Sequence, residues 1–227
     1  MHGLIFLQLQ KFAQQKAGPQ AWEILLKEAN LPVTSYSPVR TYPDQEVIAL
    51  VGAASRILKQ TSSAILESFG EFIAPELIRL YGRLLDPKWK TLDLIENTEK
   101  LVHAAVRVGN PGAKPPVLDC VRTTENELQI IYSSDRQMCH LAKGIVNGLA
   151  RHFGETITVT DDACILRGDP FCALQVIRTI KTPENTSNFG VFETNIYEEN
   201  TPFSGAGLPV KLSDSGNFTF LSPPLMN

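Results

Sequence analysis

The chain has 227 residues, of which 43% are hydrophobic, so it can bury a substantial core as one domain with an appendage or as two small domains. Its 21 basic and 24 acidic residues give a formal net charge of −3, which offers no electrostatic attraction to nucleic acid or to an anionic membrane. Because no stretch resembles a secretory signal or an uninterrupted membrane span, we expect a cytoplasmic protein whose 4 cysteines are reduced thiols, metal ligands or redox switches.

The first half of the chain has the apolar spacing of amphipathic helices, in which hydrophobic residues recur at intervals of three and four. Glycine, asparagine and proline interrupt this spacing and mark the ends of the segments. The pattern predicts helices from Ile5 to Gly18, from Trp22 to Asn30, from Asp44 to Leu58, from Ser62 to Asp86 and from Thr91 to Gly109.

The second half changes to the alternating pattern of strands. The predicted elements are strands at 117–123 and 128–132, a helix at 137–153, and strands at 157–159 and 171–177, the last two joined by a hairpin through Gly168-Asp169. A helical first half and a strand-rich second half predict an α+β fold, in which a helical N-terminal subdomain is followed by an antiparallel sheet with packed helices.

The composition of the chain shifts again near Lys181, to Asn, Ser, Thr, Gly and Pro with no periodic pattern. We therefore place one domain at residues 1–180 and interpret residues 181–227 as a linker or disordered tail. Scattered aromatic residues in this tail leave open a docking role, with short strands laid on the domain.

Two hydroxyls and a guanidinium are expected to converge where the second strand ends. In extended backbone Tyr132, Ser134 and Arg136 share one side, and such a set suits carboxylates held at the edge of an apolar site. His103 lies upstream in an apolar helical stretch and offers a lone imidazole suited to a metal. Heme needs both features, because its propionates must be anchored and its iron must be ligated.

Each of these residues also has a simpler interpretation. A histidine in an apolar helix is more often a core residue than a metal ligand. Arg136 can pair with Asp135 or Glu155 at the surface, where an ion pair contributes little to stability. The pair Pro115-Pro116 can be a rigid lead into the following strand.

A longer set of ordered matches surrounds these residues. The matches are Met1-His2-Gly3-Leu4-Ile5, Ala21-Trp22, Val51-Gly52-Ala53-Ala54-Ser55, Phe69-Gly70, His103, Pro115-Pro116 and the Tyr132, Ser134 and Arg136 set. Over roughly residues 1–180 the chain resembles a heme-nitric oxide/oxygen binding (H-NOX) domain, the gas-sensing module also found at the start of the soluble guanylate cyclase beta chain. The resemblance implies heme b, with His103 as the proximal iron ligand, Tyr132, Ser134 and Arg136 on the propionates, and Pro116 pressed on the macrocycle.

The resemblance also implies which residues face the iron from the other side. In oxygen-binding relatives a distal tyrosine lies in the helix after the Tyr-x-Ser-x-Arg motif, and the matching position here is Leu141, with Leu9, Ile73 and Ile5 as apolar companions. A hydrogen bond to a charged group is worth about 1.5–3 kcal/mol, so its absence weakens oxygen binding by roughly one to two orders of magnitude. We therefore expect nitric oxide as the ligand, with carbon monoxide able to bind and oxygen excluded. An alignment slip of one residue would bring in His140 instead.

Cysteines form a second candidate site. Cys164 and Cys172 lie symmetrically about the hairpin glycine, so they are expected to face each other closely enough for a shared metal or a disulfide. Resemblance to bacterial H-NOX proteins that bind zinc adds Cys139, and Asp161 stands where those relatives have a histidine. A zinc site with three cysteines and Asp161, a redox-active thiol set and ordinary buried cysteines remain alternatives.

A non-catalytic heme sensor is the leading hypothesis. Nitric oxide would break the bond between iron and His103, release the helix and change contacts with a separate output protein, which the resemblance implies is a histidine kinase or a cyclic-di-nucleotide enzyme. The alternatives are a zinc/thiol redox sensor on the same fold and a receptor for another apolar small molecule, because the hairpin also resembles that of 4-vinyl reductase domains. An enzyme is not expected, since no nucleophile elbow, phosphate loop or paired-carboxylate motif is present.

Overall fold

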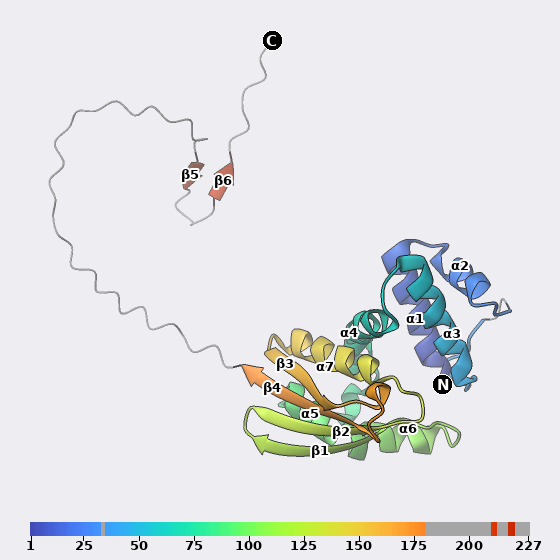
Figure 1. The fold of residues 1–227 in the computed structure, drawn as a ribbon. Coiled ribbons are helices and arrows are strands. Elements are labelled where there is room, and N and C mark those ends of the chain that lie inside the picture. The colour runs from blue at the N-terminus through green and yellow to red at the C-terminus, as the bar shows by residue number, and fades with distance from the viewer. Residues whose placement is uncertain (33–34, 180–209, 213–217, 221–227) are drawn as a thin grey trace, which may run out of the picture. The chain divides into compact units, whose positions relative to one another are not determined.

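The computed structural model describes residues 1–32 and 35–179, together with the backbone of two short antiparallel strands, Val210–Leu212 (β5) and Phe218–Phe220 (β6). The chain divides into two compact units, Met1–Thr182 and Pro183–Asn227. The larger sheet and all the labelled helices belong to the first unit (Figure 1). Apart from β5 and β6, the predicted linker or docking role of residues 181–227 lies outside the described residues.

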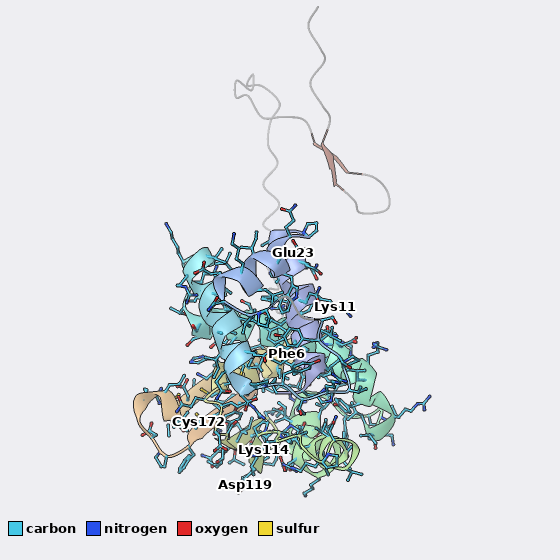
Figure 2. The ribbon with its side chains drawn as sticks, turned by 90° about the vertical axis from the view of Figure 1, so that its right-hand side faces the viewer. Phe6, Lys11, Glu23, Lys114, Asp119 and Cys172 are labelled. Carbon is cyan, nitrogen blue, oxygen red and sulfur yellow. The ribbon has the colours of Figure 1, made fainter. Side chains whose placement is uncertain are left out.

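Four helices make up the N-terminal part of the first unit. They are α1 (Gly3–Ala17), α2 (Ala21–Glu28), α3 (Asp44–Leu58) and α4 (Ser62–Tyr81). Their apolar faces enclose a common core that includes Phe6, whereas Lys11 and Glu23 point to solvent (Figure 2). The helical N-terminal subdomain predicted from the spacing is therefore confirmed. Among the described residues, no helix combines the length and apolar character needed to cross a bilayer.

The end of α4 and the start of α7 are among the helix boundaries that differ from the prediction. Helix α4 ends at Tyr81 rather than at Asp86, and a short 3-10 turn, η1 (Gly82–Leu84), follows it. Helix α7 (Cys139–Phe153) begins after the predicted Gln137, because Gln137 adopts a φ of 53°, which a right-handed helix does not permit.

The segment that carries His103 is not a uniform helix. It consists of α5 (Thr91–Thr98), a π-helical turn η2 (Glu99–His103) and α6 (Ala104–Gly109). The sequence predicts one regular helix here, because apolar spacing averages over several turns and does not reveal a single turn that is widened by one residue. Such π turns occur frequently at functional sites.

A four-stranded antiparallel sheet forms the C-terminal part of the unit. Its strands are β1 (Val117–Thr124), β2 (Glu127–Ser133), β3 (Thr156–Ala163) and β4 (Cys172–Thr179), in the order β1-β2-β4-β3. One face packs on α5 and α7 through a core of Leu92, Ile95, Leu128, Ile130, Val146, Leu149, Leu174 and Val176. The α+β prediction is confirmed, although a 3-10 turn, η3 (Ile165–Arg167), lengthens the connection between β3 and β4.

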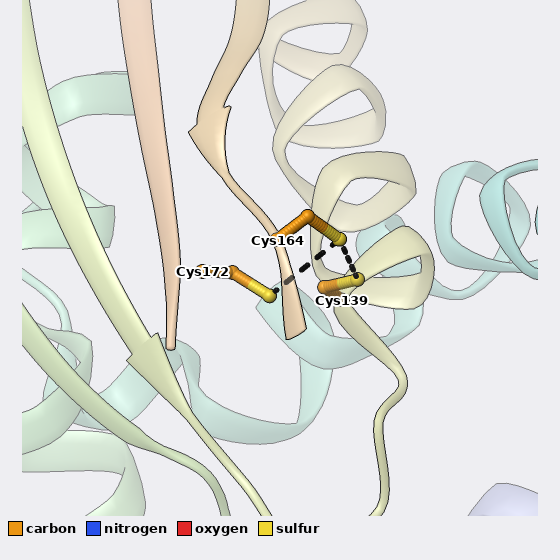
Figure 3. A group of neighbouring side chains, drawn as sticks. All are labelled: Cys139, Cys164 and Cys172. Carbon is orange, nitrogen blue, oxygen red and sulfur yellow. Dashed lines mark hydrogen bonds between the residues drawn. The ribbon is translucent and has the colours of Figure 1, made fainter. Parts of the chain in front are cut away.

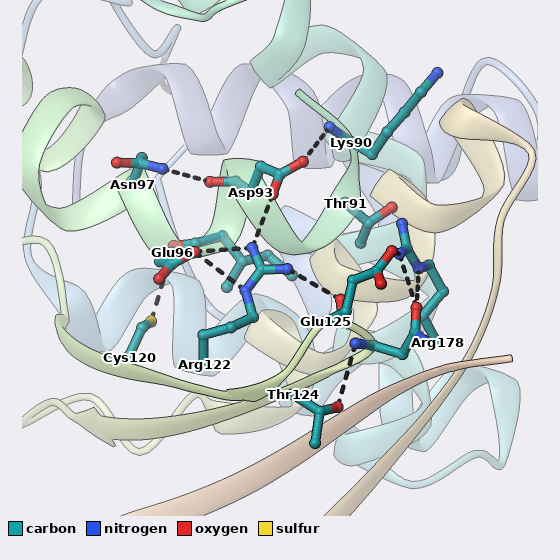
Figure 4. Close-up of polar contacts among 12 residues, drawn as sticks. Lys90, Thr91, Asp93, Glu96, Asn97, Cys120, Arg122, Thr124, Glu125 and Arg178 are labelled. Atoms are coloured by element: carbon teal, nitrogen blue, oxygen red, sulfur yellow. Dashed lines mark hydrogen bonds and ion pairs between the residues drawn. The ribbon is translucent and has the colours of Figure 1, made fainter. Parts of the chain in front are cut away.

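Polar contacts attach α5 to the edge of this sheet (Figure 4). Arg122 of β1 lies 2.8 Å from Asp93 and 2.8 Å from Glu96, both on α5. At the same end of the sheet, Arg178 of β4 lies 3.0 Å from Glu155, which accepts from the backbone N–H of Thr91 at the start of α5. The pairs of Arg122 hold α5, and with it the segment of His103, against β1, so these charged residues have a structural role.

Helices α4 and α7 approach each other closely because glycines line the contact. A Cβ atom on Gly70 would lie 2.4 Å from the Leu141 carbonyl oxygen, and one on Gly144 would lie 2.1 Å from the Glu67 carbonyl oxygen. Both distances are far below van der Waals contact, so only glycine fits at either position. This contact fixes the position of Leu141 relative to α4.

Candidate ligand-binding site

A cavity of about 500 Å³ opens between the N-terminal residues, α4, the segment from α5 to α6, the sheet and α7. Most of its wall is apolar, and its volume lies within the range of pockets that hold small molecules and cofactors. His103, Tyr132, Ser134, Arg136 and Pro116 all line it. The structure therefore brings together, around one cavity, the residues that the sequence analysis assigned to iron, propionates and macrocycle.

His103 stands in the cavity wall at the end of the π turn. Its Nδ1 atom lies 2.8 Å from Oε2 of Glu99, which leaves Nε2 as the ring nitrogen suited to a metal. Burial lowers the pKa of His103, although Glu99 and the Pro116 carbonyl act in the opposite direction. The imidazole is therefore neutral at neutral pH, which is the form that ligates metals.

Glu99 is the partner of His103 that the sequence analysis did not name. Its carboxylate also accepts from Arg107 at 2.7 Å and from the backbone N–H of Leu118 at 3.2 Å. Burial raises the pKa of Glu99, but these three donors outweigh it and bring the pKa below its usual range. Glutamate and histidine four residues apart on a helix are a recognisable signal for such a contact.

Tyr132, Ser134 and Arg136 reach the cavity by a different route from the one predicted. Strand β2 ends at Ser133, and Asp135 and Arg136 form a turn in which the Arg136 N–H donates to Ser134 Oγ at 3.2 Å. The three side chains therefore converge through a turn after the strand and not through alternation along extended backbone. Burial raises the pKa of Tyr132, so its hydroxyl stays protonated and can donate.

Arg136 is only partly satisfied by the protein. Its guanidinium contacts the Lys114 carbonyl, and Nε lies 2.9 Å from Oδ1 of Asp44, so the alternative pairings with Asp135 or Glu155 are not formed. The orientation toward Asp44 is not that of a hydrogen bond, and Nε is a buried donor without a hydrogen-bond partner among the described residues. A buried donor of this kind is costly unless something binds it, and a ligand carboxylate would do so.

The other wall of the cavity corrects part of the prediction. Ile5 and Leu141 line the cavity, but Leu9 and Ile73 do not; both lie in the N-terminal core, 3% and 1% exposed. His140, the neighbour of Leu141, does not line the cavity, and its Nδ1 lies 2.6 Å from Oε1 of Glu67.

Helix α4 supplies Leu77, Ile78 and Tyr81 to the cavity in place of Ile73. These residues lie one to two turns further along the same helix, and spacing alone does not say how far a packed helix is displaced along its axis. Tyr81 brings a phenol that the sequence analysis missed, and burial raises its pKa.

The three cysteines form a separate, buried cluster (Figure 3). Cys164 Sγ lies 3.7 Å from Cys139 Sγ and 3.9 Å from Cys172 Sγ, and the three ligand atoms lie within 4.8 Å of one another. Burial raises the pKa of Cys139 to about 12 and also raises the pKa of Cys172. The thiols can share a metal. Because the pKa values of Cys139 and Cys172 are raised, binding of that metal would have to displace their protons.

Asp161 is not available as the fourth ligand that was predicted. It pairs with Lys143 and lies 2.5 Å from Arg167, and it is not a member of the cysteine cluster in the described part of the chain. Two cations lower the pKa of Asp161 and hold its carboxylate. In this structure the cluster therefore offers three thiols, and Asp161 is held apart from them by its two cations.

The apolar wall of the cavity and its polar side chains fit heme. A mostly apolar space suits the porphyrin, the neutral imidazole of His103 suits the iron, and Arg136 offers a buried N–H that needs an acceptor. Tyr132 and Ser134 add hydroxyl donors beside the guanidinium.

Comparisons with known proteins agree with this fit. Residues 2–161, more than half of the chain, match a family model described as Haem-NO-binding (HNOB). The fold is similar to the crystal structure of an H-NOX protein from S. oneidensis in the Fe(II)NO ligation state, with a TM-score of 0.74 and 23% sequence identity over 79% of this chain and 100% of that chain.

Two further solved structures share the fold. The NMR structure of an H-NOX domain from Shewanella oneidensis in the Fe(II)CO ligation state has a TM-score of 0.71 and 23% identity, covering 79% of this chain and 99% of that chain. The crystal structure of an Fe(II) unliganded H-NOX protein from K. algicida has a TM-score of 0.70 and 22% identity, covering 79% of this chain and 97% of that chain.

Proposed function

The chain belongs to the Haem-NO-binding (H-NOX) family, and from this premise we propose that it is a non-catalytic, heme-based sensor of nitric oxide. The observation that carries the proposal is the cavity of about 500 Å³ with the neutral His103 in its wall and the unsatisfied Arg136 Nε beside it. A cofactor with a metal centre and carboxylate side chains would give the His103 imidazole a metal to bind and the Arg136 guanidinium an acceptor.

The residues of the cavity would divide the work of holding heme b. His103 would bind the iron through Nε2, and Arg136 would pair with the propionates, assisted by the Tyr132 and Ser134 hydroxyls. Pro116 lines the same cavity next to the segment of His103, where its rigid ring can press on the macrocycle.

Selectivity for nitric oxide over oxygen would follow from the aliphatic residues opposite His103. Leu141 and Ile5 offer no hydrogen bond to a ligand that becomes negatively charged, and such a bond is worth about 1.5–3 kcal/mol. Nitric oxide and carbon monoxide do not depend on that donor. Tyr81 is the residue that can oppose this proposal, because its phenol also lines the cavity.

Signalling would begin at His103. Bound heme would supply a ferrous iron able to take up nitric oxide, and His103, which would hold that iron, would be released when it does. His103 would then move together with η2 and α6, and the surface carried by this segment would change its contacts with a histidine kinase or a cyclic-di-nucleotide enzyme. The segment is suited to this because its widened turn has fewer ideal hydrogen bonds than a regular helix.

Absorption spectroscopy of the reduced, heme-loaded protein tests the proposal. We expect a change from six- to five-coordinate iron after addition of nitric oxide, and no stable oxygen complex in air. Failure to take up hemin, or a stable oxygen complex, would overturn the proposal.

The signalling step has its own test in hydrogen exchange of residues 99–109. Nitric oxide should increase exchange in the wild-type protein, whereas a His103→Gly variant loaded with heme and imidazole should show no increase. His140→Gly is the matched control, because His140 contacts Glu67 and not the cavity. An equal increase of hydrogen exchange in wild type and in His103→Gly would exclude transmission through His103.

A zinc/thiol redox sensor is the second candidate, and the clustering of Cys139, Cys164 and Cys172 within 4.8 Å favours it. It predicts a stoichiometric metal whose removal exposes three reactive thiols. Metal analysis with thiol titration before and after chelation decides it. Protein purified without metal, with unreactive thiols, would identify the cluster as packing.

A further inference from the structure

We propose that Glu99 is a positioning residue that makes His103 a more electron-rich metal ligand than an imidazole without a carboxylate partner, and that Arg107 limits this effect. The inference rests on the proposed function, since it concerns the ligand strength of His103 toward heme iron. It goes beyond that function because it assigns a tuning pair that sets how firmly the iron is held. The three side chains lie on one continuous segment, from η2 into α6.

The geometry gives each carboxylate oxygen its own partners. Oε2 of Glu99 lies 2.8 Å from Nδ1 of His103 and accepts from the Leu118 N–H at 3.2 Å, whereas Oε1 faces Arg107 at 2.7 Å. A carboxylate fixed by three donors on two elements cannot rotate away from the imidazole without losing at least one of them. Its orientation toward His103 is therefore built into the fold.

The contact between Glu99 and His103 is more shielded from water than the contact between Glu99 and Arg107. The side chain of His103 is 14% exposed and that of Glu99 is 24% exposed, whereas Arg107 is 39% exposed. An interaction that is shielded from water is screened less than one at the surface. The carboxylate therefore accepts from the imidazole in a shielded position, while Arg107, on the other oxygen, opposes its effect on His103.

The chemical consequence follows from the shared proton. When Nδ1–H donates to a carboxylate, electron density at Nε2 rises, because the proton moves toward the oxygen. A more basic Nε2 binds iron more tightly and favours the ferric over the ferrous state, since the ferric ion gains more from a donor of higher charge. The bond that nitric oxide must loosen is thereby strengthened, so Glu99 raises the threshold of the sensor.

A purely structural role is the competing interpretation. Glu99 and Arg107 can simply form a half-exposed ion pair that secures the helix, which is worth little energetically. That role would alter thermal stability but would leave the vibration of the iron–histidine bond and the reduction potential unchanged. The two interpretations therefore differ in what a spectrum of the loaded protein shows.

The test uses Glu99→Gln in the full chain loaded with heme. An amide keeps the shape and accepts a hydrogen bond, but it lacks the charge that draws the proton from His103. We expect a lower iron–histidine stretching frequency in the ferrous protein, a higher reduction potential and heme loss that is roughly 10-fold faster. Glu96→Gln is the matched control, because Glu96 lies on α5 of the same helical segment and pairs with Arg122 of β1 instead of His103.

Arg107→Gln provides a second, opposite test. Removal of the cation leaves Glu99 more basic, so the stretching frequency should rise and the potential should fall. If Glu99→Gln does not fold, the direction of change in Arg107→Gln decides, and an unchanged or lowered frequency there overturns the inference.

The remaining outcomes separate the two proposals. Wild-type values in a folded Glu99→Gln protein with His103-ligated heme would overturn the tuning role and leave the sensor function standing. Absence of histidine-ligated heme from the wild-type protein would overturn both.

Discussion

The wall of the cavity at His103 and the cluster of Cys139, Cys164 and Cys172 both gather potential metal ligands in the interior, but they are built differently. His103 faces about 500 Å³ of space, and a charged partner orients its ring. The thiols lie within 4.8 Å of one another, line no part of that cavity, and include one whose pKa burial raises to about 12. Ligand atoms alone do not make a cofactor site. The space available for the cofactor and the charges around the ligand atom determine whether it can bind.

The largest effect expected from this comparison is the loss of the histidine-ligated heme spectrum in His103→Ala. Removing the imidazole removes the axial bond, whereas replacing all three cysteines by alanine should leave the spectrum unchanged. Absorption spectra of the purified, hemin-loaded variants measure this. A spectrum that survives in His103→Ala but disappears in the cysteine variant would reverse the assignment of the two sites.

The substitution Arg136→Met should have the next largest effect. Charge-assisted hydrogen bonds are worth about 1.5–3 kcal/mol, so losing the propionate clamp should accelerate heme transfer to apomyoglobin by roughly 10- to 100-fold. Arg151→Met is the matched control, because Arg151 is 71% exposed and pairs with Glu71 on the surface. Equal transfer rates in the two variants would mean that Arg136 does not hold the propionates.

Leu141→Tyr should raise the affinity for oxygen by roughly 10-fold or more, because it adds a hydrogen-bond donor to the apolar wall. Tyr81→Phe serves as the comparison and should leave oxygen and nitric oxide binding unchanged. Oxygen titration of the reduced proteins measures both. A stable oxygen complex in the wild-type protein that disappears in Tyr81→Phe would identify Tyr81, not position 141, as the residue that sets ligand choice.

The smallest effect concerns pH and the thiols. Because burial raises the pKa of Cys139 to about 12, its thiol is neutral in both folded and unfolded chains between about pH 6 and 8. As pH rises above about 8.5 the unfolded chain loses this proton first, so the free energy of unfolding should fall. The difference in the free energy of unfolding between wild type and Cys139→Ala, measured by urea unfolding, should therefore be constant below about pH 8 and change only on the alkaline side. A chelator-sensitive divergence at acidic pH would instead show thiolates bound to a metal.

Much of the fold could be predicted because periodic burial determines it directly. The helices of the first half and the strands of the second follow from three-and-four spacing and from alternation. The gathering of His103, Tyr132, Ser134, Arg136 and Pro116 around one cavity was also anticipated, through the resemblance.

The features that could not be predicted depend on how the helices and strands pack against each other. Leu9 and Ile73 were expected in the cavity, but the placement of α4 buries Ile73 in the N-terminal core and brings Leu77 to the cavity instead. The pairing of Arg136 with Asp44 joins segments far apart in the chain, and no local pattern specifies it. The π turn at His103 was not predicted for another reason. One inserted residue barely changes the spacing of apolar residues along the helix.

The hydrogen bond from Leu118 to Glu99 has a mechanical consequence. It joins the turn of His103 to β1, which is the outermost strand in the order β1-β2-β4-β3. An outermost strand is held by a neighbour on one side only, so it yields more easily than the strands inside the sheet. A pull on the imidazole is therefore passed, through two hydrogen bonds, to an edge of the sheet as well as along the helix.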